Sequence, residues 1–286
     1  YDDENVYNVQ DLNEKTLNCL DSIITWGNRQ KNTICKFYPV NEKIVSLGNP
    51  RLDLLKKDYI TSLYKTEEDA RKYINGIFRT TITKDIVTKF KIENEDLLVM
   101  IGDFLMDNVG NQTSIRNVAA KLTSGTYKTN DKTVGAYIDY LCRSFLFYPI
   151  QRYDIKGKRY LESDKKYYLS DLSFRFAELG TKDADYGHLY ENIVALELLR
   201  RGYELYVGKL YEKEVDFVAI KEGEKLYIQV ADDISREETY KREISPLLSI
   251  KDAYPKMIIA RTKHEETQHE GIKIIDIARW LSVSQN

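Results

Sequence analysis

The stretch from Gly187 to Asp233 reads GHLYENIVALELLRRGYELYVGKLYEKEVDFVAIKEGEKLYIQVADD. Its first part has the pattern of a helix, and this helix carries Glu191. Strands are expected over 203–207, 215–220 and 225–230, and a Lys-Glu-Gly-Glu turn joins the last two. Asp216 and Gln229 fall on these strands. A helix followed by short strands therefore begins an α/β domain.

The residues after Asp233 continue the alternation of helices and strands. Ser235 is placed to cap a charged amphipathic helix that runs to Pro246 or slightly past it. Strands are expected at 256–260 and 272–275, before a terminal helix with Trp280. The fold class is α/β overall. We expect a short α/β fragment at 1–60, a helical region with a winged helix at 61–180, and a final α/β domain at 181–286.

The order of parts around Glu191 resembles the restriction-endonuclease-like fold. Metal-dependent nucleases of that fold use an acid on the helix, an Asp after the turn, and an acid-x-Lys pair on the next strand. The matching acids here are Glu191 and Asp216. Gln229 and Ala231 stand in place of the last pair, so the resemblance implies a degenerate nuclease-like site.

The missing groups matter to the chemistry. A hard cation such as Mg²⁺ prefers two or more carboxylate oxygens, and a lysine beside it orients or deprotonates the attacking water. Gln229 offers only a neutral carbonyl oxygen and Ala231 offers nothing. We therefore expect no catalytic residues, no cofactor and no metal. Under the nuclease alternative, Glu191 and Asp216 would hold Mg²⁺. Asp232 or Asp233 would then supply the third carboxylate, but not both, since neighbours on a strand point to opposite faces.

Residues 94–170 have the pattern of a winged helix-turn-helix. Apolar positions recur at helical spacing in three segments. Gly110 and Asn111 break the first, Ser114 can cap the second, and Asn130 or Asp131 can cap the third, which is the recognition-helix candidate. The inward positions are Leu97, Ile101 and Leu105, then Ile115, Val118, Ala119 and Leu122, then Val134, Ile138, Leu141 and Phe145. A hairpin follows.

Two parts of this region present cations to a nucleic acid. Lys132 and Arg143 lie among the outward positions of the third helix, together with Thr133 and Asp139. The hairpin at 152–160 is the stronger patch, with two tyrosines, one anion and four cations, Arg152, Lys156, Lys158 and Arg159. One explanation for the cations of this hairpin is that they contact phosphates. Exposed hairpins also carry lysines to stay soluble and to discourage edge pairing.

The segment from Thr66 to Phe90 is expected to be helical, with a capping-box-like Thr66 and Asp69 and with Ala70, Tyr73, Ile74 and Ile77 on one face. Upstream, strands are expected at 22–25 and 43–47, with a helix at 28–37 and a turn at 48–51. There, WGNRQKN and EKIVSLGNPRLDLL resemble a piece of glycosyltransferases that build surface carbohydrates, over about residues 5–55. The polar stretch 56–65 marks a boundary.

A wider resemblance covers residues 64–286. It is carried by KDIVTKFKI at 84–92, by YIDYLCRSFLFYPIQRYDIKGKRYLESDKKYYLSDLSFRFA at 137–177, and by the stretch quoted first. These are similar to the C-terminal region of a family of prokaryotic AAA-type ATPases, in which a winged helix and a domain of unknown function follow the nucleotide-binding core. No G-x-x-x-x-G-K-[ST] loop occurs, so we expect no bound ATP.

The net charge, the cysteines and the length of the apolar runs narrow the kind of protein that this chain can be. The net charge of −2 excludes a globally basic nucleic-acid binder. Cys19, Cys35 and Cys142 show no ligand spacing, which favours a reducing compartment. No apolar run could span a membrane and no signal peptide is evident, so a cytoplasmic protein is expected. Because the chain begins with Tyr1, we consider it a fragment, a truncation or a fusion.

Isolated residues with a chemical interpretation are few. His188 could reach Glu191 as a ligand or proton carrier, although a capping or surface role fits a lone histidine better. Asp171 is expected to cap a helix. His264 and His269 are assigned to a loop without function.

The sequence predicts a non-catalytic interaction module. Its partner would be a nucleic acid, such as DNA, or a protein, such as an ATPase subunit. The first alternative is a metal-dependent nuclease. The second is a glycosyltransferase remnant at the N-terminus.

Overall fold

The computed structural model describes residues 66–123, 128–180, 185–262 and 266–282, together with two short strands, β1 (Ile23–Thr25) and β2 (Ile44–Ser46). β1 and β2 pair in parallel, and each lies inside a segment for which the sequence predicts a strand. The expected helix at 28–37, the turn at 48–51 and the boundary at 56–65 lie outside the described residues. Cys19, Cys35 and His264 lie outside them too.

A helical region begins with α5 (Glu67–Thr80), the π-helical η4 (Thr81–Thr88) and α6 (Glu95–Asp107). The predicted cap of α5 is confirmed, because Thr66 Oγ1 accepts from the Asp69 N–H at 3.1 Å and donates to Asp69 Oδ2 at 2.8 Å. Ala70 is buried, but Tyr73 is 47% exposed, so its assignment to the inner face is wrong. Phe78 of this helix is fully buried.

The winged helix consists of α6, β3 (Gln112–Thr113), α7 (Ile115–Thr123), α8 (Asp131–Arg143) and the hairpin of β4 (Phe147–Asp154) and β5 (Arg159–Leu169). Asn130 caps α8, as predicted, by accepting from the Thr133 N–H at 2.9 Å. Nine of the eleven predicted inward positions are buried. Ile115 is 37% exposed and Phe145 is 67% exposed, so both predictions are wrong.

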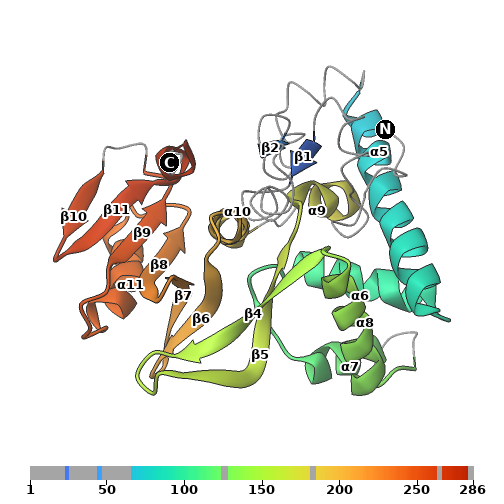
Figure 1. Ribbon diagram of the computed structural model, residues 1–286, viewed down its shortest axis with the longest axis horizontal. Coiled ribbons are helices and arrows are strands. Elements are labelled where there is room, and N and C mark those ends of the chain that lie inside the picture. Colours follow the sequence, from blue (N-terminus) through green and yellow to red (C-terminus); the bar gives the residue numbers. More distant parts are fainter. Residues whose placement is uncertain are drawn as a thin grey trace.

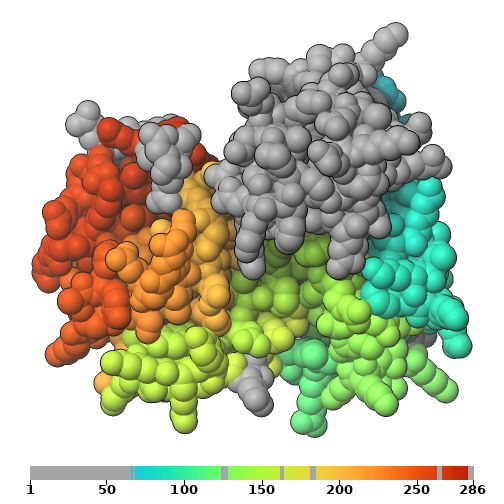
Figure 2. All heavy atoms as spheres, in the orientation of Figure 1, coloured from blue at the N-terminus to red at the C-terminus, as the bar shows by residue number. Residues whose placement is uncertain are grey.

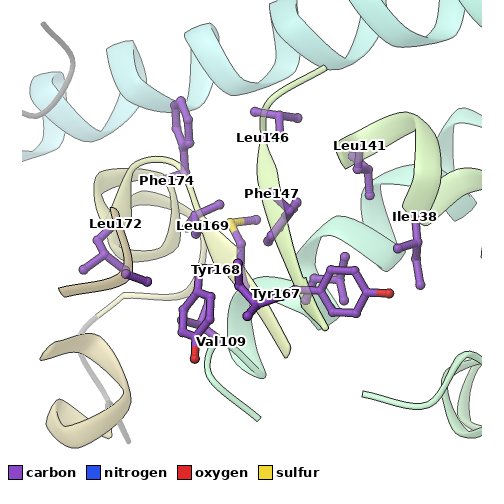
Figure 3. Close-up of a cluster of buried hydrophobic side chains, with 14 of the residues drawn as sticks. Val109, Ile138, Leu141, Leu146, Phe147, Tyr167, Tyr168, Leu169, Leu172 and Phe174 are labelled. Atoms are coloured by element: carbon purple, nitrogen blue, oxygen red, sulfur yellow. The ribbon is translucent and has the colours of Figure 1, made fainter. Parts of the chain in front are cut away.

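The end of α8 explains Phe145. The helix stops at Arg143, and Phe145 has a φ of 58°, so its side chain leaves the helical register that would have buried it. Leu146 and Phe147 turn inward instead. Figure 3 shows them with Ile138 and Leu141 of α8, near Tyr167 and Tyr168 of β5.

The last part contains six strands and four helices within the described residues. The sequence places most of these elements correctly, and two assignments are wrong. His269 lies on a strand rather than in a loop, and Ser235 does not cap the following helix, whose N-cap is Arg236. The elements are α9 (Leu172–Leu179), α10 (Tyr186–Arg200), β6 (Glu204–Leu210), β7 (Lys213–Lys221), β8 (Glu224–Ala231), α11 (Glu237–Leu248), β9 (Lys256–Ala260), β10 (Thr267–His269), β11 (Ile272–Asp276) and α12 (Ile277–Ser282).

A single mixed sheet links the winged helix to the last part. In the described residues its order is β10-β11-β9-β8-β7-β6-β4-β5-β3. β4 pairs in parallel with β6 over four residue pairs, so the hairpin is built into the sheet (Figure 1). α10 packs against β5–β8 and α11 against β7–β9, and their apolar residues belong to two separate core clusters. The α/β fold class is confirmed.

A β-bulge interrupts β7 at one of the predicted site residues. Tyr206 and Gly208 of β6 lie opposite Val218 and Val215 of β7. Asp216 and Phe217 therefore share the single partner Val207. A bulge of this kind re-aims a side chain, and Asp216 and Phe217 are both buried although they are adjacent on the strand.

None of the helices in the part of the chain that the structure describes has the length and apolar character that crossing a membrane requires.

Candidate functional site

α10 brings Glu191 to the sheet. The helix begins after Asp185, whose Oδ1 accepts from the Gly187 N–H at 2.9 Å. Asn192, fully buried, donates to the Leu169 carbonyl at 2.9 Å and accepts from the Leu169 N–H at 2.7 Å. These two bonds fix the rotation of α10 against β5. Glu191 consequently lies inside, with 4% of its surface exposed.

Two side chains from β5 meet the Glu191 carboxylate. Lys166 Nζ lies 2.8 Å from Glu191 Oε1, and the Tyr168 hydroxyl donates to the same oxygen. Lys166 Nζ also lies 2.8 Å from Glu214 Oε1 on β7. The other oxygen of Glu214 accepts from the Gln112 side chain on β3. The winged helix thus contributes an amine, a hydroxyl and an amide to this cluster.

Asp216 and Gln229, the other two predicted site residues, are hydrogen-bonded to groups of β8 and α11. Asp216 Oδ2 accepts from the Val230 N–H at 2.7 Å. The Gln229 side chain donates to Glu243 Oε2 at 2.9 Å, and Arg242 donates to the other oxygen of Glu243 at 2.7 Å. Glu243 lies on α11 and is buried. A carboxylate therefore stands beside Gln229, supplied by a helix rather than by β8.

Burial and neighbouring charges shift the pKa values of three side chains in this cluster. Burial lowers the pKa of Lys166, but the Glu191, Asp216 and Glu214 carboxylates outweigh it, and the net pKa is raised above its ordinary value. Burial and the Glu191 charge raise the pKa of Asp216 well above its usual range, although Lys166 lowers it. Burial, with Glu191, raises the pKa of Tyr168. Lys166 therefore stays cationic and Tyr168 stays a hydrogen-bond donor.

The site opens into a cleft of about 1110 Å³. Its wall includes Glu191, Asp216, Gln229 and Glu243, and cations such as Lys213 and Arg236 also line it. Among the described residues, no three His, Cys, Asp or Glu side chains converge closely enough to hold a metal ion. The arrangement is a buried, internally paired charge cluster beside an open cleft.

Asp232, Asp233 and His188 line the same cleft, but each of them bonds to a residue outside the charge cluster. Asp232 Oδ1 accepts from Arg261 at 2.9 Å, and Asp233 accepts from the Ser235 N–H at 2.7 Å. His188 Nδ1 lies 3.3 Å from Asp185 Oδ2 rather than reaching Glu191. Asp171 caps α9, as predicted, by accepting from the Ser173 N–H at 2.8 Å.

The predicted nucleic-acid-binding residues fall in two places. Lys132 and Arg143 are exposed on α8, where Arg143 lies 3.7 Å from Asp139. Lys156, Lys158 and Arg159 are exposed around the hairpin turn. Arg152 is half-buried on β4, and its Nε has no hydrogen-bond partner among the described residues.

Sequence reasoning missed the groups that complete the charge cluster, Lys166, Tyr168, Asn192, Glu214 and Glu243. All come from elements that only the tertiary fold brings together. One signal was available, because Lys166 precedes the apolar run Tyr167-Tyr168-Leu169 in a strand, where a cation between buried neighbours needs a partner.

Comparisons with known proteins identify homologues. Residues 59–185 match the family model described as a domain of unknown function (DUF8612). An uncharacterized protein of Haemophilus influenzae is 37% identical over 258 residues, which cover 86% of this chain and 64% of that protein. An uncharacterized protein of Methanocaldococcus jannaschii is 28% identical over 209 residues, which cover 72% of this chain and 44% of that protein. No solved structure matches the chain.

The chain spans less than two thirds of the length of these two relatives. The match to the domain of unknown function covers the helical region and the winged helix, and it ends at Asp185, the N-cap of α10.

Proposed function

We propose that this chain is a non-catalytic interaction module that binds nucleic acid through its winged helix and hairpin. The observation that carries the proposal is the placement of Lys166 between Glu191 and Glu214. An ammonium already balances the carboxylate that a nuclease would use for a divalent cation. Removing one member of such a buried pair leaves the other uncompensated, so the cluster acts as a structural joint.

The surface argument comes from the exposed cations. Lys156, Lys158 and Arg159 surround the hairpin turn, and Lys132 and Arg143 lie on the recognition-helix candidate. The chain as a whole is slightly acidic, so contact with phosphates depends on these local groups.

The resemblance to ATPase C-terminal regions supports a partner. We propose that the module works in the cytoplasm beside an AAA-type ATPase, either as another part of a longer protein or as a separate subunit. Each of the two relatives contains sequence beyond the part that this chain matches.

Reversing the hairpin charges tests nucleic-acid binding. The variant Lys156→Glu/Lys158→Glu/Arg159→Glu should weaken binding to a labelled DNA duplex at least tenfold and reduce the slope of log affinity against log salt by about three. Fluorescence anisotropy at several salt concentrations measures both. The matched control is Lys72→Glu/Lys84→Glu/Lys89→Glu, three exposed lysines on α5, on η4 and at the C-cap of η4. Equal affinities for the two triple variants would remove the hairpin from the binding surface.

A metal-dependent nuclease is the second candidate, and two contacts favour it. Lys166 places an amine beside Glu191, and Glu243 places a carboxylate beside Gln229. The two groups absent from β8 thus have counterparts from β5 and α11. Incubation of single- and double-stranded DNA and RNA with Mg²⁺ or Mn²⁺ tests it. Cutting that Asp216→Ala abolishes would replace our proposal with this one, whereas intact substrates would support the interaction module.

A further inference from the structure

Two turns lie side by side at one end of the sheet. β4 and β6 are parallel, with Asp154 opposite Lys209, so their carboxyl ends meet at the same edge. The Ile155 N–H donates to the Lys209 carbonyl at 2.9 Å, which ties the two ends together. We call residues 153–160 and 209–212 the two-turn surface. Figure 2 shows the hairpin part of it at the lower edge of the molecule.

Tyrosine rings are open to solvent on this surface. Tyr160 is 58% exposed and Tyr211 is 61% exposed. The Tyr160 ring packs against Tyr206, with centroids 4.9 Å apart, and against the buried Tyr153 at 5.6 Å. Its neighbours therefore hold the ring in place while more than half of the residue faces solvent.

Cations surround these rings. The two-turn surface has four, Lys156, Lys158, Arg159 and Lys209, against the two acids Asp154 and Glu212. Lys156 Nζ lies 4.6 Å from the centroid of the Tyr211 ring. Asp154 is itself partly balanced by Arg159 at 3.6 Å. The surface is net positive on a chain whose overall charge is −2.

The combination of open rings and cations points to a class of nucleic acid. A tyrosine ring stacks on the open face of an unpaired base, as in a single strand, while lysines and arginines contact the phosphates. The parallel pairing of β4 with β6 also holds the hairpin in the sheet, so the rings and the cations are presented on a fixed surface.

We infer that the two-turn surface binds single-stranded nucleic acid, with bases stacked on Tyr160 and Tyr211 and phosphates held by Lys158 and Arg159. The inference rests on the proposed function and names its substrate class.

Anisotropy with a labelled 20-nucleotide oligo-dT and with a duplex of the same length tests this inference on the full chain. Tyr160→Ala and Tyr211→Ala should each weaken oligo-dT binding by about fivefold to 150-fold, because stacking is lost, with the salt slope unchanged. Lys158→Ala should lower that slope by about 0.7. Tyr160→Phe and Tyr211→Phe keep the rings and should bind as the unmodified chain does. Tyr73→Ala, at an exposed tyrosine of α5, is the matched control.

The outcomes separate the two proposals. Duplex binding without oligo-dT binding would overturn the stacking inference and leave the proposed function standing. No binding to either nucleic acid would overturn both and would point to a protein partner for this surface. Oligo-dT binding that survives both alanine substitutions would also overturn the inference, because the strand would then lie elsewhere.

Discussion

The positively charged side chain of Lys166 lies in the interior, and only 3% of the residue is exposed. Its ammonium forms ion pairs with two carboxylates, those of Glu191 and Glu214. The energetic balance of such a cluster depends on every member. The Lys166 ammonium compensates the charges of Glu191 and Glu214. Tyr168 donates a further hydrogen bond to Glu191, and Gln112 donates one to Glu214. A change at any one of these residues acts on the others.

We predict that Lys166→Met lowers the free energy of unfolding by about 3–5 kcal/mol, because it leaves Glu191 charged and buried without a counter-ion. Urea denaturation followed by circular dichroism measures the loss. The double variant Lys166→Met/Glu191→Gln should recover more than half of it. Lys165→Met, at the adjacent and less buried lysine, should cost less than about 1 kcal/mol. A double variant no more stable than Lys166→Met would contradict the compensation.

The sequence indicates some residues of the site and not others, for a physical reason. Glu191, Asp216 and Gln229 follow from a local order of helix, strand and strand, and the structure places all three along the same cleft. Lys166 and Glu243 enter through the packing of β5 and α11, and although a local pattern marks Lys166 as a buried cation, none identifies its partners. Asp232 likewise bonds to Arg261, 29 residues away in the sequence, whereas Asp233 accepts from the Ser235 N–H in a local turn.

At the scale of elements, caps are predictable because they depend on a few adjacent residues. Thr66, Asn130 and Asp171 each accept a backbone N–H at the start of the expected helix. Helix ends and bulges are less predictable, since tertiary packing decides them. Phe145 leaves α8 because the chain turns to begin β4, and the bulge at Asp216 depends on its pairing with β6.

Gly208, opposite this irregular region, has no room for a side chain. A Cβ there would lie 2.9 Å from Ile155 Cδ1 and 3.0 Å from both Val215 Cβ and Val218 Cγ2. We predict that Gly208→Ala lowers stability by about 1–3 kcal/mol through overpacking.

The matched control for Gly208→Ala is Gly76→Ala, in the exposed middle of α5, where a Cβ meets nothing within 4 Å. It should raise stability by about 1 kcal/mol, because alanine favours the helix. Thermal and urea unfolding measure both variants, and effects of the same sign would contradict the packing described here.

At the scale of the whole molecule, one sheet and one large core cluster cross the winged helix and the last α/β part. The cluster includes Phe78 of α5, Leu141 of α8, Ile228 of β8 and Trp280 of α12. The sequence predicts the succession of parts, but the pairing of β4 with β6 brings together strands separated by β5, α9 and α10, and only the tertiary fold reveals it.

We therefore expect the described parts to unfold in one cooperative transition. Calorimetry should show a single transition for residues 66–282, and Leu98→Ala in α6 or Ile228→Ala in β8 should each lower its midpoint, with a loss of about 2–5 kcal/mol. The two sites lie on opposite sides of the β4–β6 junction. Two transitions, each sensitive to only one substitution, would contradict this expectation.

The parallel register of β4 and β6 has a mechanical consequence. Both strands run toward the two-turn surface, and the slanted hydrogen bonds between them are evenly spaced. If a motor protein pulled the hairpin along the strand axis, the tension would load all of these bonds together in shear rather than peel them apart singly. The joint would then transmit force from the hairpin to β6, and through β6 to β7, which carries Asp216, before it ruptured.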